Sequence, residues 1–84
     1  MAININEKID GELSDVLLKH TDRNDRSEIC KIHGLKPYTL KNIVYMEQKV
    51  MNSSQIKAVE DLKEKAKAKC ESASLDYQFL NSYA

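Results

Sequence analysis

The sequence predicts an all-α protein, a compact bundle of four or five short helices. Only two glycines and one proline occur in 84 residues, so little in the chain interrupts a helix. Apolar residues recur every three or four positions, which is the spacing of one helix face. Residues that cap helices stand directly before several of these periodic stretches. We expect residues 1–84 to form a single domain.

The first helix has two candidate starts, because Asn6 and Asp10 can both act as its cap. Gly11 interrupts a helix that starts at Asn6, at a cost of about 1 kcal/mol relative to alanine. The apolar stripe of this helix is Ile9, Leu13, Val16 and Leu17. A polar loop is expected over residues 20–24.

The start of the second helix is predicted from a capping box. Asp25 and Glu28 have the required spacing, with the aspartate at the cap and the glutamate three residues later. Ile29, Cys30 and His33 then follow at helical spacing.

A tight turn at Gly34 is expected to separate this helix from a third one. The third helix begins at Pro37, because proline has no N–H to lose at a first helical position, and runs to about residue 45. Its apolar face holds Leu40, Ile43 and Val44.

Asn52 and Gln55 form another cap pair, which opens a long helix. The apolar stripe of that helix is Ile56, Val59, Leu62, Ala66, Cys70 and Ala73. The expected core of the whole bundle is Leu13, Val16, Leu17, Ile29, Leu35, Leu40, Ile43, Ile56, Val59 and Leu62.

The C-terminal segment, residues 71–84, is too apolar to stay unpacked. Two alternatives are open: it folds back over Ile9 and Leu13, or it forms the interface of a homodimer. The residues that would do either are Leu75, Tyr77, Phe79, Leu80 and Tyr83.

A known motif has a small residue on one helix, a glycine four residues later, an apolar residue after it and two more on the next helix. Cys30, Gly34, Leu35, Leu40 and Ile43 match these positions. Residues 26–45 thereby resemble a DNA-binding helix-turn-helix of the lambda-repressor/Cro-like kind, and the similarity covers roughly residues 9–70. Cys30 departs from the usual alanine, and Lys36 from the usual serine cap. The resemblance implies a central helix-turn-helix and a small bacterial or phage regulator.

Double-stranded DNA is the partner that this resemblance implies. The start of the second motif helix would lie in the major groove, which nominates four residues for base contacts. These are Lys36, Tyr38, Lys41 and Asn42. Phosphate contacts are expected from Arg26, Lys31 and Thr39. Residues 20–50 hold six basic against four acidic side chains, a local excess of two positive charges.

An alternative function is a protein-interaction module, either an adaptor or a phage protein that binds a host protein. The zero net charge, from 13 basic and 13 acidic residues, and the apolar C-terminal segment favour it. Salt-dependent binding to duplex DNA would distinguish the two functions.

Other classes of function have little support. No serine, histidine and acid fall into a catalytic arrangement and there is no glycine-rich phosphate loop, so we expect neither an enzyme nor a cofactor. Cys30 and His33 share a helix side, but zinc requires four ligands and no second close pair exists, so no metal is expected. No apolar run approaches the ~20 residues of a membrane span. With two cysteines and no signal peptide, we expect a cytoplasmic protein.

Overall fold

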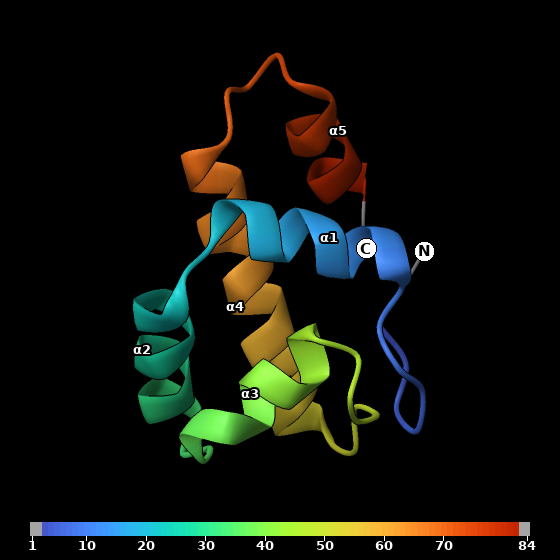
Figure 1. The fold of residues 1–84 in the computed structure, drawn as a ribbon, viewed down its shortest axis with the longest axis vertical. Helices are drawn as coiled ribbons and strands as arrows, with labels where there is room; N and C mark the ends of the chain where they lie inside the picture. Colours follow the sequence, from blue (N-terminus) through green and yellow to red (C-terminus); the bar gives the residue numbers. More distant parts are fainter. Residues whose placement is uncertain (1–2, 83–84) are drawn as a thin grey trace.

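The computed structural model describes residues 3–82, and five helices form within that range. They are α1 (Gly11–His20), α2 (Arg23–His33), α3 (Pro37–Val44), α4 (Ser53–Lys69) and α5 (Leu75–Ser82). Helix α4 packs against all four others, and Figure 1 shows α1 crossing it, with α2 and α3 toward one end and α5 at the other. The predicted all-α bundle, with a turn joining two central helices, is confirmed. Within residues 3–82, no helix is both long and apolar enough to cross a membrane.

Asp10, and not Asn6, caps α1. Its carboxylate accepts the backbone N–H of Glu12 at 3.4 Å. Asn6 instead has a left-handed backbone with φ of 69° and precedes a short antiparallel bridge between Glu7 and Val50. The Asn6 N–H donates to the Val50 carbonyl at 2.6 Å, and the Val50 N–H donates to the Glu7 carbonyl at 3.0 Å. The N-terminal segment is thereby fixed to the loop that follows α3.

The predicted start of α2 was wrong by three residues. Asp22 is the N-cap, and its carboxylate accepts the N–H of Asp25 at 3.0 Å while the Asp25 carboxylate accepts the N–H of Asp22 at 3.1 Å. The capping box is therefore Asp22–Asp25, and Glu28 lies on the exposed side of the helix, where it pairs with Lys65 at 3.4 Å. As a result Arg23 belongs to the first turn of α2 and not to the expected loop.

The turn between α2 and α3 has the expected glycine. Gly34 is left-handed, with φ of 66° and ψ of 29°. Its N–H and that of Leu35 both bond to the carbonyl of Cys30 and so close the end of α2. Helix α3 then begins at Pro37 as predicted. Lys36, at the cap position, makes no side-chain hydrogen bond to the helix, which fits the absence of the usual serine there.

Asn52 caps α4 as predicted, accepting the N–H of Gln55 at 3.0 Å. The helix ends at Lys69, and Cys70 takes an extended conformation. The expected apolar stripe therefore stops at Ala66, and Cys70 and Ala73 lie outside the helix. The chain turns there because Ser74 starts α5, its hydroxyl oxygen accepting the N–H of Tyr77 at 3.1 Å.

The core contains most of the residues expected from the periodicity. Leu13, Leu17, Ile29, Leu40, Ile43, Val59 and Leu62 are fully buried. Val16, Leu35 and Ile56 are half-buried and pack against this core. The core also includes Ile9, Cys30, Val44, Val50, Ala58, Ala66 and Leu80.

The C-terminal segment packs back on the bundle through α5. Leu80 is fully buried in the core and Phe79 packs against it. Asp76 pairs with His20 at the end of α1, at 2.7 Å. Of the expected interface residues that the structure describes, only Leu75 is largely exposed, at 82%. Tyr83 lies outside the described residues.

Candidate nucleic-acid interface

Helix α3 presents a continuous outward face. Lys41, Asn42 and Tyr45 come three, four and seven residues after Tyr38, which places all four on one side of a helix. The opposite side of α3 is buried, and the two tyrosines are exposed to solvent, Tyr38 by 55% and Tyr45 by 47%. These four residues are called the α3 face below.

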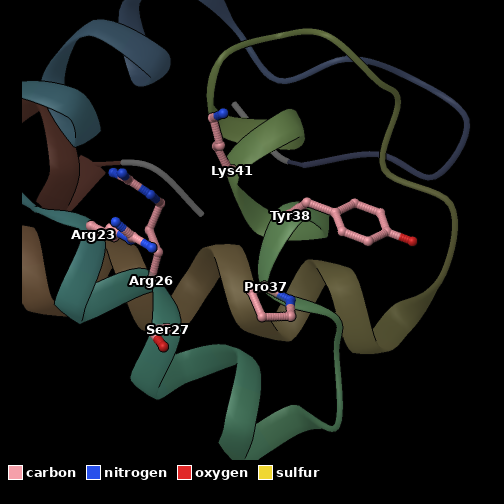
Figure 2. A pocket seen from close by; sticks show the side chains of 6 residues that line it. All are labelled: Arg23, Arg26, Ser27, Pro37, Tyr38 and Lys41. Atoms are coloured by element: carbon pink, nitrogen blue, oxygen red, sulfur yellow. The ribbon is translucent and has the colours of Figure 1, made fainter.

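A hollow of about 560 Å³ lies between α2 and α3, beside the α3 face. It is called the α2–α3 hollow, and its lining is Arg23, Arg26, Ser27, Pro37, Tyr38 and Lys41. Figure 2 shows the side chains of Arg23 and Arg26 close together on the α2 side, with Lys41 across from them on α3. The ring of Tyr38 points away from the two arginines, and three of the six lining residues are cationic.

The corrected start of α2 explains how the hollow is built. Arg23 and Ser27 are four residues apart and Arg26 is three from Arg23, so a helix that begins at Arg23 turns all three side chains to one side. Sequence reasoning missed Arg23 because it placed residues 20–24 in a loop, and it did not single out Ser27, which lay in the first turn of the helix expected after Asp25. The signal that could have found them is Asp22, which precedes Asp25 by three residues and satisfies the same capping pattern.

Two cations of this region lie over aromatic rings. The guanidinium carbon of Arg26 is 5.8 Å from the centroid of the Tyr45 ring. The ammonium nitrogen of Lys36 is 5.9 Å from the centroid of the Tyr38 ring. Such contacts orient a cationic side chain while most of its N–H donors stay available to an anion. The Arg26–Tyr45 contact also joins α2 to the end of α3.

The basic side chains around α3 are not neutralised by acids. Within residues 3–82, no carboxylate oxygen lies within 4.0 Å of the five expected or newly found cations of this region, which are Arg23, Arg26, Lys31, Lys36 and Lys41. Three lysines of α4 differ in this respect, since Lys65, Lys67 and Lys69 pair with Glu28, Glu64 and Asp25. The chain is neutral overall, but its positive charge is locally uncompensated at α2 and α3.

The other nominated residues have separate positions. Asn42 is half-buried on the α3 face and donates from Nδ2 to Gln48 Oε1 at 3.4 Å, which links it to the loop after α3. Thr39 is also half-buried, on α3. Lys31 is exposed on α2. Neither Thr39 nor Lys31 lines the hollow, so the structure brings together Arg26, Tyr38 and Lys41 and leaves these two apart.

The residues considered as metal ligands make other contacts. Cys30 is buried in the core, and burial raises the pKa of its thiol, so the neutral form is favoured there. His33 contacts Asp61 at 2.6 Å, which connects the end of α2 to α4. His20 contacts Asp76. Among the described residues, no group of three or more histidine, cysteine or acidic side chains is arranged to hold a metal ion.

The fold and this region define a class: a small all-α protein in which two helices joined by a tight turn present an unpaired basic surface. Compared with known proteins, the sequence matches no family model, no curated protein and no solved structure. The function proposed for the chain therefore depends on the α3 face and the α2–α3 hollow.

Proposed function

We propose that this chain is a sequence-specific DNA-binding regulator of transcription, of the small bacterial or phage kind, with α3 in the major groove. The observation that supports the proposal most directly is the α3 face. It carries residue types that can contact bases, and beside it lie cations that no acidic side chain of the described residues pairs with. Such a protein would act by blocking or positioning the transcription machinery, with no chemistry of its own.

The dimensions of α3 suit a groove. An α-helix with its side chains is about 10–12 Å in diameter, and the major groove is about 12 Å wide and admits one α-helix. Asn42 carries the amide that pairs with adenine N6 and N7, and Lys41 carries a donor for guanine O6 and N7. The contact from Gln48 restrains the Asn42 amide before DNA arrives, which reduces the entropy lost on binding.

The charge distribution suits salt-sensitive binding of modest strength. Each phosphate neutralised by a cation contributes about −0.9 to the slope of log affinity against log salt concentration. Lys31, Lys36 and the arginines of the hollow are available for such contacts because no acid pairs with them in the described part of the chain. The zero net charge leaves little long-range attraction beyond this surface.

Selection from a randomised duplex library, followed by binding titrations at several salt concentrations, tests the proposal. Asn42→Ala should weaken the selected site by about 1–3 kcal/mol and leave random DNA nearly unchanged. Lys31→Ala should weaken all duplexes alike and flatten the salt slope. Lys65→Ala is the matched control, because Lys65 is a lysine of α4 already paired with Glu28 at 3.4 Å. Absence of binding to the whole library at low salt would rule out the DNA function.

A protein-interaction module is the second candidate, and exposed apolar side chains favour it. Ile32 on α2 is 65% exposed, and Tyr38 and Tyr45 are about half exposed on the α3 face. Aromatic residues are enriched where proteins bind one another. In that case Tyr45→Ala would weaken binding to the protein partner, and the affinity would change little with salt.

A further inference from the structure

The α2–α3 hollow is the strongest unassigned feature of the molecule, and we infer that it is a phosphate-binding site that takes one backbone phosphate of the bound DNA. This inference rests on the proposed function and makes it more specific. It adds Arg23 and Ser27 to the interface, beside Arg26 and Lys41.

The donors in the hollow match the chemistry of a phosphate. Arg23 and Arg26 each carry a planar, permanently charged guanidinium whose N–H groups fit phosphate oxygens in pairs. Ser27 lies on the α2 side and Lys41 on α3, so side chains from two helices line the hollow (Figure 2). In the described chain, no acidic residue belongs to the lining. The nearby carboxylate of Asp25 is occupied by Lys69 and by the N–H of Asp22.

The hollow is arranged before any ligand binds. Arg26 is oriented by its contact with the Tyr45 ring, 5.8 Å from the centroid. The relative position of α2 and α3 is set by the left-handed turn at Gly34 and by the buried side chains beneath it. A site that needs no rearrangement loses less affinity to the ordering of side chains.

The shape of the hollow favours a phosphate over a stacked base. The Tyr38 ring points away from Arg23 and Arg26 (Figure 2), and among the described residues no other aromatic side chain lines the hollow. The remaining lining is Pro37 and the polar groups of α2. The hollow adjoins the α3 face. A phosphate bound there would therefore fix the position of α3 along the major groove, because phosphate contacts set the register of a protein on the duplex.

A methylphosphonate scan of the selected duplex tests the inference. Each backbone phosphate is replaced in turn by an uncharged methylphosphonate, and the affinity is measured for the wild type, Arg23→Ala, Arg26→Ala and Lys31→Ala. At one position, or two adjacent ones, the wild type should lose roughly tenfold or more, because a charge-assisted hydrogen bond is lost. Each arginine variant should lose less affinity there than the wild type, because one of the contacts to that phosphate is already absent. Lys31→Ala, an exposed cation of the same helix outside the hollow, should lose as much as the wild type.

The outcomes separate this inference from the proposed function. If all variants lose affinity equally at every position, DNA binding stands and the phosphate site is overturned. If no duplex binds, the proposed function fails, and titration with inorganic phosphate at low salt, followed by amide chemical shifts, decides the site. Shifts confined to residues 23–27 and 37–41, and absent in Arg23→Ala, support it. Shifts spread over the exposed lysines of the chain overturn it.

Discussion

Asp25 on α2 and Lys69 at the end of α4 form an ion pair whose carboxylate also closes the capping box of α2. The Asp25 carboxylate accepts hydrogen bonds from Lys69 Nζ and from the backbone N–H of Asp22, the latter at 3.1 Å. Asp25 is only 8% exposed. The Asp25 side chain thus caps the start of α2 and also binds the end of α4. Both arginines of the hollow lie on α2.

Replacing Asp25 should therefore destabilise the fold. Asp25→Ala removes half of the capping box and leaves Lys69 without its partner, and we expect a loss of about 1–2 kcal/mol in the free energy of unfolding. Urea denaturation followed by circular dichroism measures it. Glu28→Ala is the control, since Glu28 makes only a surface ion pair with Lys65 and should change stability by less than about 0.5 kcal/mol. A cost for Glu28→Ala as large as that for Asp25→Ala would restore Asp25–Glu28 as the capping box.

The same contact gives a pH dependence. Burial alone raises the pKa of Asp25, but the hydrogen bonds from Lys69 and from the Asp22 N–H outweigh it and hold the pKa below 3.8. A lowered carboxyl pKa stabilises the fold above the unfolded value of 3.8, and this contribution disappears as the pH falls through the folded pKa. The stability gap between the wild type and Asp25→Asn should therefore narrow on acidification from about pH 5 to about pH 2. A gap that stays constant would show that the ion pair does not lower the pKa of Asp25.

The helices themselves could be predicted because they depend on local patterns. The cap of α4 at Asn52, the proline start of α3 and the glycine turn were all predicted from residues a few positions apart. The start of α2 was not, because Asp22 and Asp25 both have a suitable partner three residues on. Contacts with α4 distinguish them, because Lys69 pairs with Asp25 from 44 positions away and Lys65 pairs with Glu28, and no local pattern contains either contact.

Contacts between distant segments also explain the core residues that were missed. Val50 follows a stretch without periodicity, and its burial depends on the bridge to Glu7, which lies 43 residues earlier near the N-terminus. Leu80 was recognised as apolar, but its packing on the bundle depends on α5 turning back after Cys70. Sequence periodicity reports which side of a helix is apolar, and it does not report what covers that side.

The candidate interface was predicted only in part, because periodicity reports the face of one helix and not its neighbours from other segments. Tyr38, Lys41 and Asn42 share a face of α3, which helical spacing alone implies. Their neighbours from other segments could not be predicted that way. Arg23 reaches the hollow because α2 begins at Arg23, with Asp22 as its cap. Asn42 contacts Gln48 because the loop after α3 folds back on the helix.

Replacing glycine by alanine should have opposite effects on stability at Gly34 and at Gly11, because only Gly34 is left-handed. Gly34→Ala should cost about 1–2 kcal/mol, because φ of 66° is unfavourable for a residue with a Cβ atom although no atom lies within 4 Å of the new methyl group. Gly11→Ala, in the first turn of α1 with no positive φ, should stabilise by about 0.5–1 kcal/mol. Thermal and urea unfolding of both variants measure the effects. Two changes of the same sign would contradict the assigned backbone at Gly34.

The last prediction concerns the two leucines of α5, which lie in opposite environments. Leu80 is fully buried, so Leu80→Ala should cost about 2–5 kcal/mol through lost burial and the cavity it leaves, whereas Leu75 is 82% exposed, so Leu75→Ala should change stability by less than about 0.5 kcal/mol. Urea denaturation gives both values. Sedimentation of the same variants separates folding from association, because a homodimer that uses this segment would have to include Leu75, its most exposed apolar residue. Leu75→Glu would then give a stable monomer. If Leu80→Ala instead kept the stability of the wild type and only dissociated a dimer, α5 would belong to an interface between chains and not to the core of one chain.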